Sequence, residues 1–371
     1  METTLHPPPG WRKDWPGLRM LPEIPPWSAV ANATPHIAVP NGESDGQEAQ
    51  VHKIEIREPD PSVRPRRHVS DDVAYLRTVF VNLFFYGRPG AASGSWVLID
   101  AGLPGSAPWI LAAAEERFGP WAHPAAVILT HGHFDHVGAL HSLLEKWDVP
   151  VYAHPLELPY LTGRSPYPPP DPTVGGGAMA SLSRFYPRGP YNFTNRVQPL
   201  PADGSVPGMP GWRWIHTPGH TPGHVSLYRD SDRSLIAGDA FVTTKQESAI
   251  AALTQRPGIH GPPAYFTPDW VAARRSVEQL VALQPLRVAT GHGPPMEGEE
   301  MLQGLHRLAR DFDRLAVPRQ GRYVREPAVA DERGVIAVPP AVPDPLPRIL
   351  LGVGLALVAG VVLRRRFARA G

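Results

Sequence analysis

The sequence predicts an α/β fold in which helices lie outside a core of two sheets. Short apolar runs rich in Val, Ile and Leu alternate with longer runs whose apolar residues recur at helical spacing. This alternation is typical of layered α/β domains. Length and composition agree with one large domain and additional segments, because the chain has 371 residues and its 47 prolines are concentrated where a core is least expected.

Residues 1–50 are predicted to form a Pro-rich N-terminal arm that is partly ordered. Pro7-Pro8-Pro9 and the polar stretch 41–50 are typical of extended chain. Buried aromatic side chains can hold such an arm on a domain, and this arm contains three tryptophans: Trp11, Trp15 and Trp27. No basic segment followed by an apolar run opens the chain, so we expect no cleaved secretory signal.

The predicted main domain spans residues 51–315. Strands are expected at 51–57, 78–86 and 96–100, with a Gly-rich turn before the last of them. Helices are expected where apolar residues recur at helical spacing, at 108–118, 137–147, 270–282 and 299–315.

A dense group of metal-ligand residue types occurs at His131-Gly132-His133-Phe134-Asp135-His136, directly after the apolar stretch 127–130. Imidazole nitrogens and carboxylate oxygens both bind zinc-like divalent ions. If His131 and His133 lie at the end of a strand, both can face one ion. Asp135 and His136, at the start of the following helix, can then reach a second ion. The segment therefore predicts two metals, against the alternative of a histidine-rich loop without ligands.

Further ligands are expected where other apolar strands end. His220 lies in the segment 216–224, whose Pro-Gly pairs predict tight turns after a strand. Asp239 follows the apolar run 235–238, and His292 follows 287–291. Glycine stands before or beside each candidate, which removes side-chain bulk where the backbone must approach an ion.

Taken together, these residues resemble the metallo-β-lactamase fold superfamily, whose pattern is His-x-His-x-Asp-His followed by a distant His, an Asp and a final His. The resemblance covers roughly residues 51–315, and the strand Trp96–Gly102 is similar to the family's Asp-x-Gly strand. It implies the four-layer αββα sandwich. Carried over by position, it implies a first metal held by His131, His133 and His220, a second held by Asp135, His136 and His292, and Asp239 bridging both. The complete ligand set argues against a metal-free relative.

The resemblance implies a binuclear zinc hydrolase with two Zn2+ ions, although such ligands also accept Fe or Mn. Two ions can share a hydroxide nucleophile, which Asp135 and Asp239 would orient as catalytic residues. The expected substrate is a small ester, thioester or lactone, since Tyr152-Ala153-His154-Pro155 and 216–220 are similar to the glyoxalase II-like branch. The chain has no cysteine and no Gly-x-Ser-x-Gly segment, which excludes thiol catalysis and disfavours a serine triad.

Three other functions remain open. The same scaffold can hold a single iron and oxidise a sulfur substrate, as a mononuclear sulfur dioxygenase. The superfamily also includes nucleases and phosphodiesterases, but a formal net charge of +1 gives no sign of a nucleic-acid surface, so we expect no nucleic-acid partner. A membrane-tethered binding protein that has lost turnover is the third, and the complete ligand set opposes it.

Other polar residues near the motif are assigned supporting roles. His224 is expected to be a hydrogen-bond partner close to the ligands and not a ligand itself. Asp100 is expected to orient a ligand or a turn. His216 and His154 are interpreted as structural, and His141 as a surface or helix-packing residue.

The irregular segment between His154 and Gln198 is predicted to set substrate choice. Long insertions beside a metal site commonly form lids or pocket walls. The segment contains several tyrosines, among them Tyr160, Tyr167 and Tyr191. Each could donate a hydrogen bond to a substrate carbonyl, but packing is the favoured interpretation for any one of them.

The last segments predict membrane attachment. A Pro-rich linker is expected at 316–348, an apolar helix at 349–363 and a basic tail at 364–371. The helix would span about 22 Å, less than the roughly 30 Å hydrocarbon core, although arginine side chains at its end can extend its reach. Because it follows a linker and has no core to join, we expect it to attach the chain to a membrane. The catalytic domain is expected on the cytoplasmic side, since no secretory signal precedes it.

Overall fold

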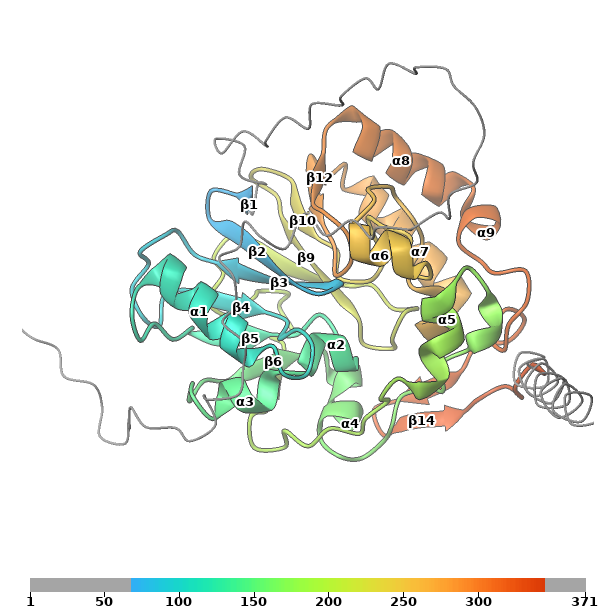
Figure 1. Cartoon of the computed structure of the whole chain (residues 1–371), viewed down its shortest axis with the longest axis horizontal. Coiled ribbons are helices and arrows are strands. Elements are labelled where there is room, and N and C mark those ends of the chain that lie inside the picture. The colour runs from blue at the N-terminus through green and yellow to red at the C-terminus, as the bar shows by residue number, and fades with distance from the viewer. Residues whose placement is uncertain (1–67, 344–371) are drawn as a thin grey trace, which may run out of the picture. The chain divides into compact units, whose positions relative to one another are not determined.

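The computed structural model describes residues 68–343 (Figure 1). Several predictions made from the sequence concern segments outside the described residues: the N-terminal arm 1–50, the strand 51–57, the C-terminal helix 349–363 and the basic tail 364–371.

The first sheet has seven strands, which are hydrogen-bonded in sequence order from β1 to β7. Their bounds are β1 (His68–Ser70), β2 (Val73–Thr78), β3 (Val81–Tyr86), β4 (Val97–Ile99), β5 (Ala126–Ile128), β6 (Val151–Ala153) and β7 (Val197–Pro199). The pairs from β1 to β4 are antiparallel, and those from β4 to β7 are parallel. The carboxyl ends of β4 to β7 therefore lie at one edge of the sheet, where loops can carry functional residues.

The second sheet has five strands in the order β12-β11-β10-β9-β8. Their bounds are β8 (Trp212–His216), β9 (Val225–Arg229), β10 (Ser234–Ile236), β11 (Arg287–Ala289) and β12 (Met296–Glu297). Only β10 and β11 pair in parallel.

The two sheets pack face to face through a buried apolar layer. In β4, Val97 and Ile99 belong to this layer, whereas Leu98 belongs to a second cluster on the outer face. Successive residues of a strand point to opposite faces, so an uncharged strand such as β4 can be buried on both sides. The layer continues into the second sheet through Trp212, Leu227 and Ile236.

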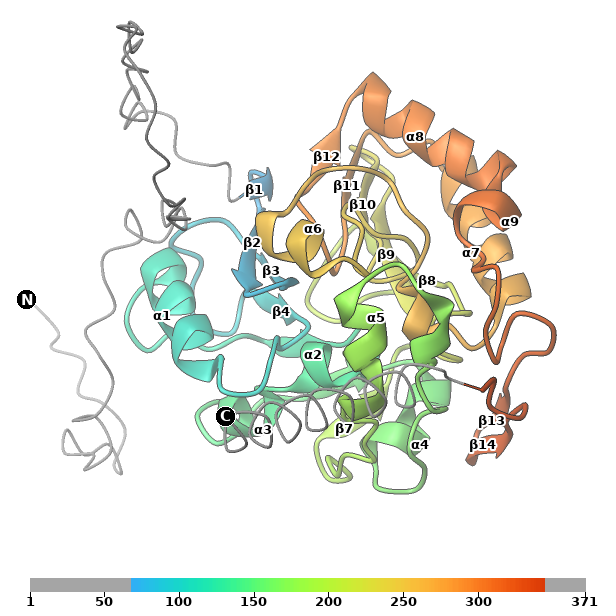
Figure 2. The same ribbon diagram turned by 45° about the vertical axis from the view of Figure 1, so that its right-hand side comes forward.

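Helices cover the outer face of each sheet (Figure 1 and Figure 2). The first sheet is covered by α1 (Ala107–Phe118) and α3 (Leu140–Leu144), and the second by α7 (Trp270–Ala282) and α8 (Glu299–Arg310). The remaining α-helices are short: α2 (Phe134–Val137), α4 (Leu158–Leu161), α5 (Ala178–Leu182), α6 (Ala249–Thr254) and α9 (Phe312–Leu315). The order helix, sheet, sheet, helix is the predicted α/β sandwich.

Two of the predicted helices are interrupted. The helix predicted at 137–147 is replaced by α2 and α3, which are separated by Gly138 and Ala139. A Cβ at Gly138 would come within 2.3 Å of Pro104, so the chain makes a close approach there. The helix predicted at 299–315 breaks at Asp311, between α8 and α9.

The strand predicted at 78–86 is observed as β3, which begins only at Val81 because a tight turn precedes it. The chain reverses at Val79 and Phe80, so that β2 and β3 pair from Thr78–Val81 outwards. Val79 has a φ of +63°, a left-handed conformation that valine rarely adopts. No Gly, Pro or Asn marks this turn in the sequence, so the sequence pattern does not separate the turn from the strand that follows it.

The segment 316–343, assigned from the sequence to a linker, carries a small hairpin of β13 (Val329–Asp331) and β14 (Gly334–Ala337). Its backbone is hydrogen-bonded to earlier parts of the chain: Ala328 N donates to Pro268 O over 3.0 Å, and Val335 N to Ser165 Oγ over 3.1 Å. Among the helices within residues 68–343, none combines the length and apolar character needed to cross a membrane.

Candidate metal centre

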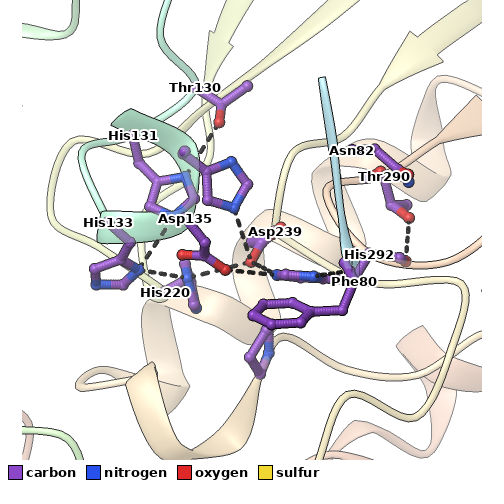
Figure 3. A network of polar contacts seen from close by, with 12 residues as sticks. Phe80, Asn82, Thr130, His131, His133, Asp135, His220, Asp239, Thr290 and His292 are labelled. Atoms are coloured by element: carbon purple, nitrogen blue, oxygen red, sulfur yellow. Dashed lines mark hydrogen bonds and ion pairs between the residues drawn. The ribbon is translucent and has the colours of Figure 1, made fainter. Parts of the chain in front are cut away.

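The seven predicted ligands meet where strands of both sheets end, and Figure 3 labels all of them except His136. The segment 131–136 follows β5 and runs into α2, while His220 lies in the turn between β8 and β9. Asp239 follows β10, and His292 follows β11. Each of the seven residues is at most 5 % exposed, so their polar atoms face one another and not solvent.

Three imidazoles form the first group. His133 Nδ1 lies 3.1 Å from His131 Nε2 and 2.9 Å from His220 Nε2. Burial lowers the pKa of His131 and His133 well below the usual histidine value, and lowers the pKa of His220 to about 3. The rings are therefore neutral, and neutral imidazole is the form that binds a metal.

The second group combines a carboxylate with two imidazoles. The ligand atoms of Asp135, His136 and His292 lie within 4.8 Å of one another, and His292 Nε2 is 3.5 Å from Asp135 Oδ2. Burial acts to lower the pKa of both histidines, but Asp239 and the neighbouring carboxylates outweigh it and raise both values. This group therefore has the more negative surroundings.

Asp239 lies between the two groups. Its Oδ2 is 3.0 Å from His292 Nε2, 3.5 Å from His220 Nε2 and 3.7 Å from His136 Nε2. Burial acts to raise the pKa of Asp239, but nearby His292 and His136 hold it well below its usual value. A carboxylate that stays ionised and reaches both groups is suited to bridge two cations.

The chemistry of these residues fits divalent metal ions. His136 Nε2 and Asp239 Oδ1 are buried and have no hydrogen-bond partner within residues 68–343. Such orphaned buried atoms are costly unless something binds them. A Cβ at Gly291 would come 2.1 Å from Asp239 Oδ1 and 2.7 Å from His136 Cε1, so the absence of a side chain there keeps space at the ligands. Nitrogen and carboxylate donors in this number match zinc, iron or manganese.

Hydrogen bonds orient several ligand rings. His136 Nδ1 donates to Asp100 Oδ2 over 2.9 Å, and His292 Nδ1 donates to Phe80 O over 2.8 Å. Because each Nδ1 is held by a hydrogen bond, Nε2 is the ring nitrogen that a metal would bind in place of a proton. Asp100 therefore orients a ligand, as the sequence predicts. Phe80 acts through its backbone carbonyl, which no side-chain pattern could indicate.

His224 supports the bridging carboxylate and not a metal. Its Nε2 accepts a hydrogen bond from the backbone N–H of Asp239 over 2.8 Å, and its Nδ1 lies 2.9 Å from Thr217 Oγ1. Both ring nitrogens are occupied, which agrees with the predicted role of a hydrogen-bond partner.

The remaining histidines near the motif have no ligand geometry. His154 and His216 stack with ring centroids 4.2 Å apart, and His216 Nε2 donates to Pro222 O over 2.8 Å. This bond holds the loop that carries His220. The ring of His141 is 79 % exposed on α3, as expected for a surface residue.

The insertion after β6 forms one wall of a small pocket beside the first group. The pocket is lined by His133, Tyr167, Pro168, Pro169, His220, Phe266, Pro268 and Tyr323. Tyr167 stacks on Tyr160 with ring centroids 4.0 Å apart and also packs on His133. The sequence indicated Tyr167 as a candidate wall residue, whereas Phe266 and Tyr323 carried no recognisable signal.

Comparisons with known proteins agree with this geometry. The model of the metallo-beta-lactamase superfamily matches residues 77–292. The probable metallo-hydrolase YflN of Bacillus subtilis is 49 % identical over 234 residues, covering 63 % of this chain and 88 % of the relative. The probable metallo-hydrolase YybB of the same organism is 32 % identical over 171 residues, covering 46 % and 65 %.

Solved structures are similar as well. One protein crystallised in a di-iron-bound form is 30 % identical, with a TM-score of 0.40, and the match covers 64 % of this chain and 96 % of that protein. The family match spans more than half of the sequence and contains all seven residues of the two groups. The chain therefore belongs to the metallo-beta-lactamase superfamily.

Proposed function

We propose that this protein is a metal-dependent hydrolase that cleaves a small ester, thioester or lactone. The observation that carries the proposal is the pair of buried ligand groups joined by Asp239. His131, His133 and His220 would hold one ion, and Asp135, His136 and His292 the other, with Asp239 shared. Bound divalent ions supply an activated water at neutral pH and polarise a carbonyl or phosphoryl oxygen.

The protein's own residues would prepare that reaction in two ways. Asp135 and Asp239 place carboxylate oxygens on the same side of His292, where they can accept hydrogen bonds from an attacking water and fix its orientation. The surrounding burial excludes bulk water and strengthens each of these interactions.

The apolar side chains beside the first group support a substrate with an uncharged acyl group. The pocket wall next to His133 and His220 consists of proline and aromatic side chains, which suit such a group. We further propose that the metal is zinc and that the protein acts like the glyoxalase II-like branch, a preference that rests on the segments 152–155 and 216–220.

Two measurements on one preparation test the hydrolase proposal. Protein purified without added metal is analysed for zinc, iron and manganese, and a panel of esters, thioesters, lactones and phosphodiesters is then assayed. Two zinc ions per chain with turnover of an acyl substrate are expected, and Asp135→Asn should abolish that turnover. One iron per chain with oxygen uptake on a sulfur substrate would establish the dioxygenase instead, and cleavage of phosphodiesters alone would establish the nuclease class.

We also propose that segment 349–363 attaches the chain to a membrane, with the catalytic domain on the cytoplasmic side. The basis is the uncharged run and the arginines that follow it. Fractionation of cells expressing the whole chain and a chain ending at residue 343 tests this. Equal amounts of both forms in the membrane fraction would contradict it.

A further inference from the structure

Glu157 is a fully buried carboxylate that the proposed chemistry does not use. It ends the short 3-10 helix Pro155–Glu157, which follows β6, and its exposed fraction is 0 %. A buried carboxylate is costly unless hydrogen bonds compensate it. Burial raises the pKa of Glu157 to about 7, even though four hydrogen bonds act to lower it.

The two carboxylate oxygens bind two different loops. Oε2 accepts hydrogen bonds from Tyr167 Oη and from the backbone N–H of Gly132, the latter over 3.0 Å. Oε1 accepts from Thr221 Oγ1 over 2.7 Å and from the backbone N–H of Gly223 over 2.8 Å. Each oxygen thus receives one hydroxyl and one amide, which fills the capacity of an ionised carboxylate.

Both loops carry ligands of the first group. Gly132 stands between His131 and His133, and Thr221 directly follows His220. His133 and His220 are 87 residues apart in sequence, yet their rings are in contact. One side chain therefore connects the two segments that must meet for three imidazoles to face the same point.

The glycines at the contact points show how close the connection is. A Cβ at Gly132 would come 2.6 Å from Tyr167 Oη. A Cβ at Gly223 would come 2.7 Å from Glu157 N and 2.9 Å from Glu157 Oε1. Neither position could carry a larger residue without moving the carboxylate or its tyrosine partner.

We infer that Glu157 is a positioning residue for the first metal group. It holds the loop that carries His131 and His133 against the loop that carries His220, so that the three imidazoles face one point. The inference rests on the proposed metal-dependent function. The second group receives no hydrogen bond from Glu157 among the described residues, so the effect should be confined to one of the two ions.

Zinc binding by Glu157→Gln tests the inference. An amide has one acceptor oxygen and one NH2 donor, so whichever loop faces the NH2 group loses its hydrogen bonds. Competition against a chromophoric chelator should show one of two zinc ions bound about 10- to 100-fold more weakly, as is typical for partners of metal ligands. The affinity for the other ion should be unchanged, and Co2+ titration should show an altered absorption spectrum for the weakened site.

Asp171→Asn is the matched control. Asp171 is also a buried carboxylate and accepts hydrogen bonds from Thr173 N, Thr173 Oγ1 and Arg322 N, but it binds neither metal loop. Its loss should lower thermal stability and leave both zinc affinities unchanged. An equal loss of zinc affinity in Asp171→Asn would show a general effect of destabilisation and overturn the inference.

The outcomes separate this inference from the proposed function. If the wild-type protein binds no divalent ion, the proposed function fails. If it binds two and Glu157→Gln binds both as tightly as wild type, only the positioning role is wrong. Should Glu157→Gln not fold, Thr221→Val carries the test, because it removes the hydroxyl that the His220 loop donates to Glu157 Oε1. Unchanged zinc affinity in Thr221→Val would then refute the role.

Discussion

Replacing Gly291 by alanine is a direct test of the space around the bridging carboxylate. Gly291 lies between β11 and His292, and its φ is outside the left-handed range, so alanine meets no backbone penalty there. The added methyl group would come 2.1 Å from Asp239 Oδ1 and 2.7 Å from His136 Cε1. The effect of the substitution is therefore steric and directed at two ligands.

The expected magnitude follows from these distances. Non-bonded carbon and oxygen atoms require roughly 3.4 Å, so the carboxylate must move by about 1 Å. A displacement of this size at a reacting centre costs about 100-fold in rate. Overpacking destabilises the folded state by about 1–3 kcal/mol, which leaves most domains folded.

The assay compares Gly291→Ala with Gly258→Ala. The nearest atom to a Cβ at Gly258 is His260 Nε2 at 3.2 Å, at the end of a side chain that can adjust. Metal content by elemental analysis and kcat/KM on the substrate identified in the panel should both fall for Gly291→Ala and stay near wild type for Gly258→Ala. Wild-type metal content and rate in Gly291→Ala would refute the assignment of Asp239 and His136 to the centre.

Three further changes have expected outcomes. Removing metal with a chelator should lower Tm, because ligands that bind only the folded state stabilise it, and a thermal melt with and without added zinc checks this. Asp239→Asn should weaken metal binding and lower kcat/KM by about 10- to 100-fold or more, since it removes the charge shared by both groups, and a variant with two tightly bound ions and full activity would contradict the bridging role. Burial and the neighbouring His216 lower the pKa of His154 to about 4. The unfolded chain takes up this proton near pH 6.5 and the folded protein does not, so stability should fall as pH decreases from 6.5 to about 4. His154→Gln should flatten that slope in urea unfolding, while His141→Gln, at an exposed ring, should leave it as in wild type.

Helix caps and apolar periodicity in the sequence predict several elements of the fold. The helix expected at 270–282 is observed with those bounds, because Asp269 caps it by accepting a hydrogen bond from Ala272 N and its apolar residues face the second sheet. The turn at Val79 could not be predicted, since valine rarely adopts the left-handed conformation found there. Apolar periodicity alone does not reveal the breaks at Gly138 and Asp311.

The candidate site also contains residues that the sequence predicts and residues that it does not. The segment 131–136 can be recognised as a metal site from the sequence alone, because metal-ligand residue types at such short spacing can adopt only a few local arrangements. Glu157 carries no such signal: its partners lie 10 to 66 residues away in sequence, and two of them are backbone amides. A buried carboxylate that binds backbone groups is visible only once the loops are placed in space.

Metal binding and the lining of the pocket draw on different parts of the chain, because segment 316–343 contributes to the pocket and supplies no ligand. All seven candidate metal ligands come from residues 131–292, whereas Tyr323, which lines the pocket, comes from this later segment and is fixed by a 2.6 Å hydrogen bond from its Oη to Pro169 O. Sequence change after residue 315 can therefore reshape the pocket beside the first ligand group without touching a ligand. Exchanging this segment between homologous proteins offers a route to new substrate selectivity on an unaltered metal-binding scaffold.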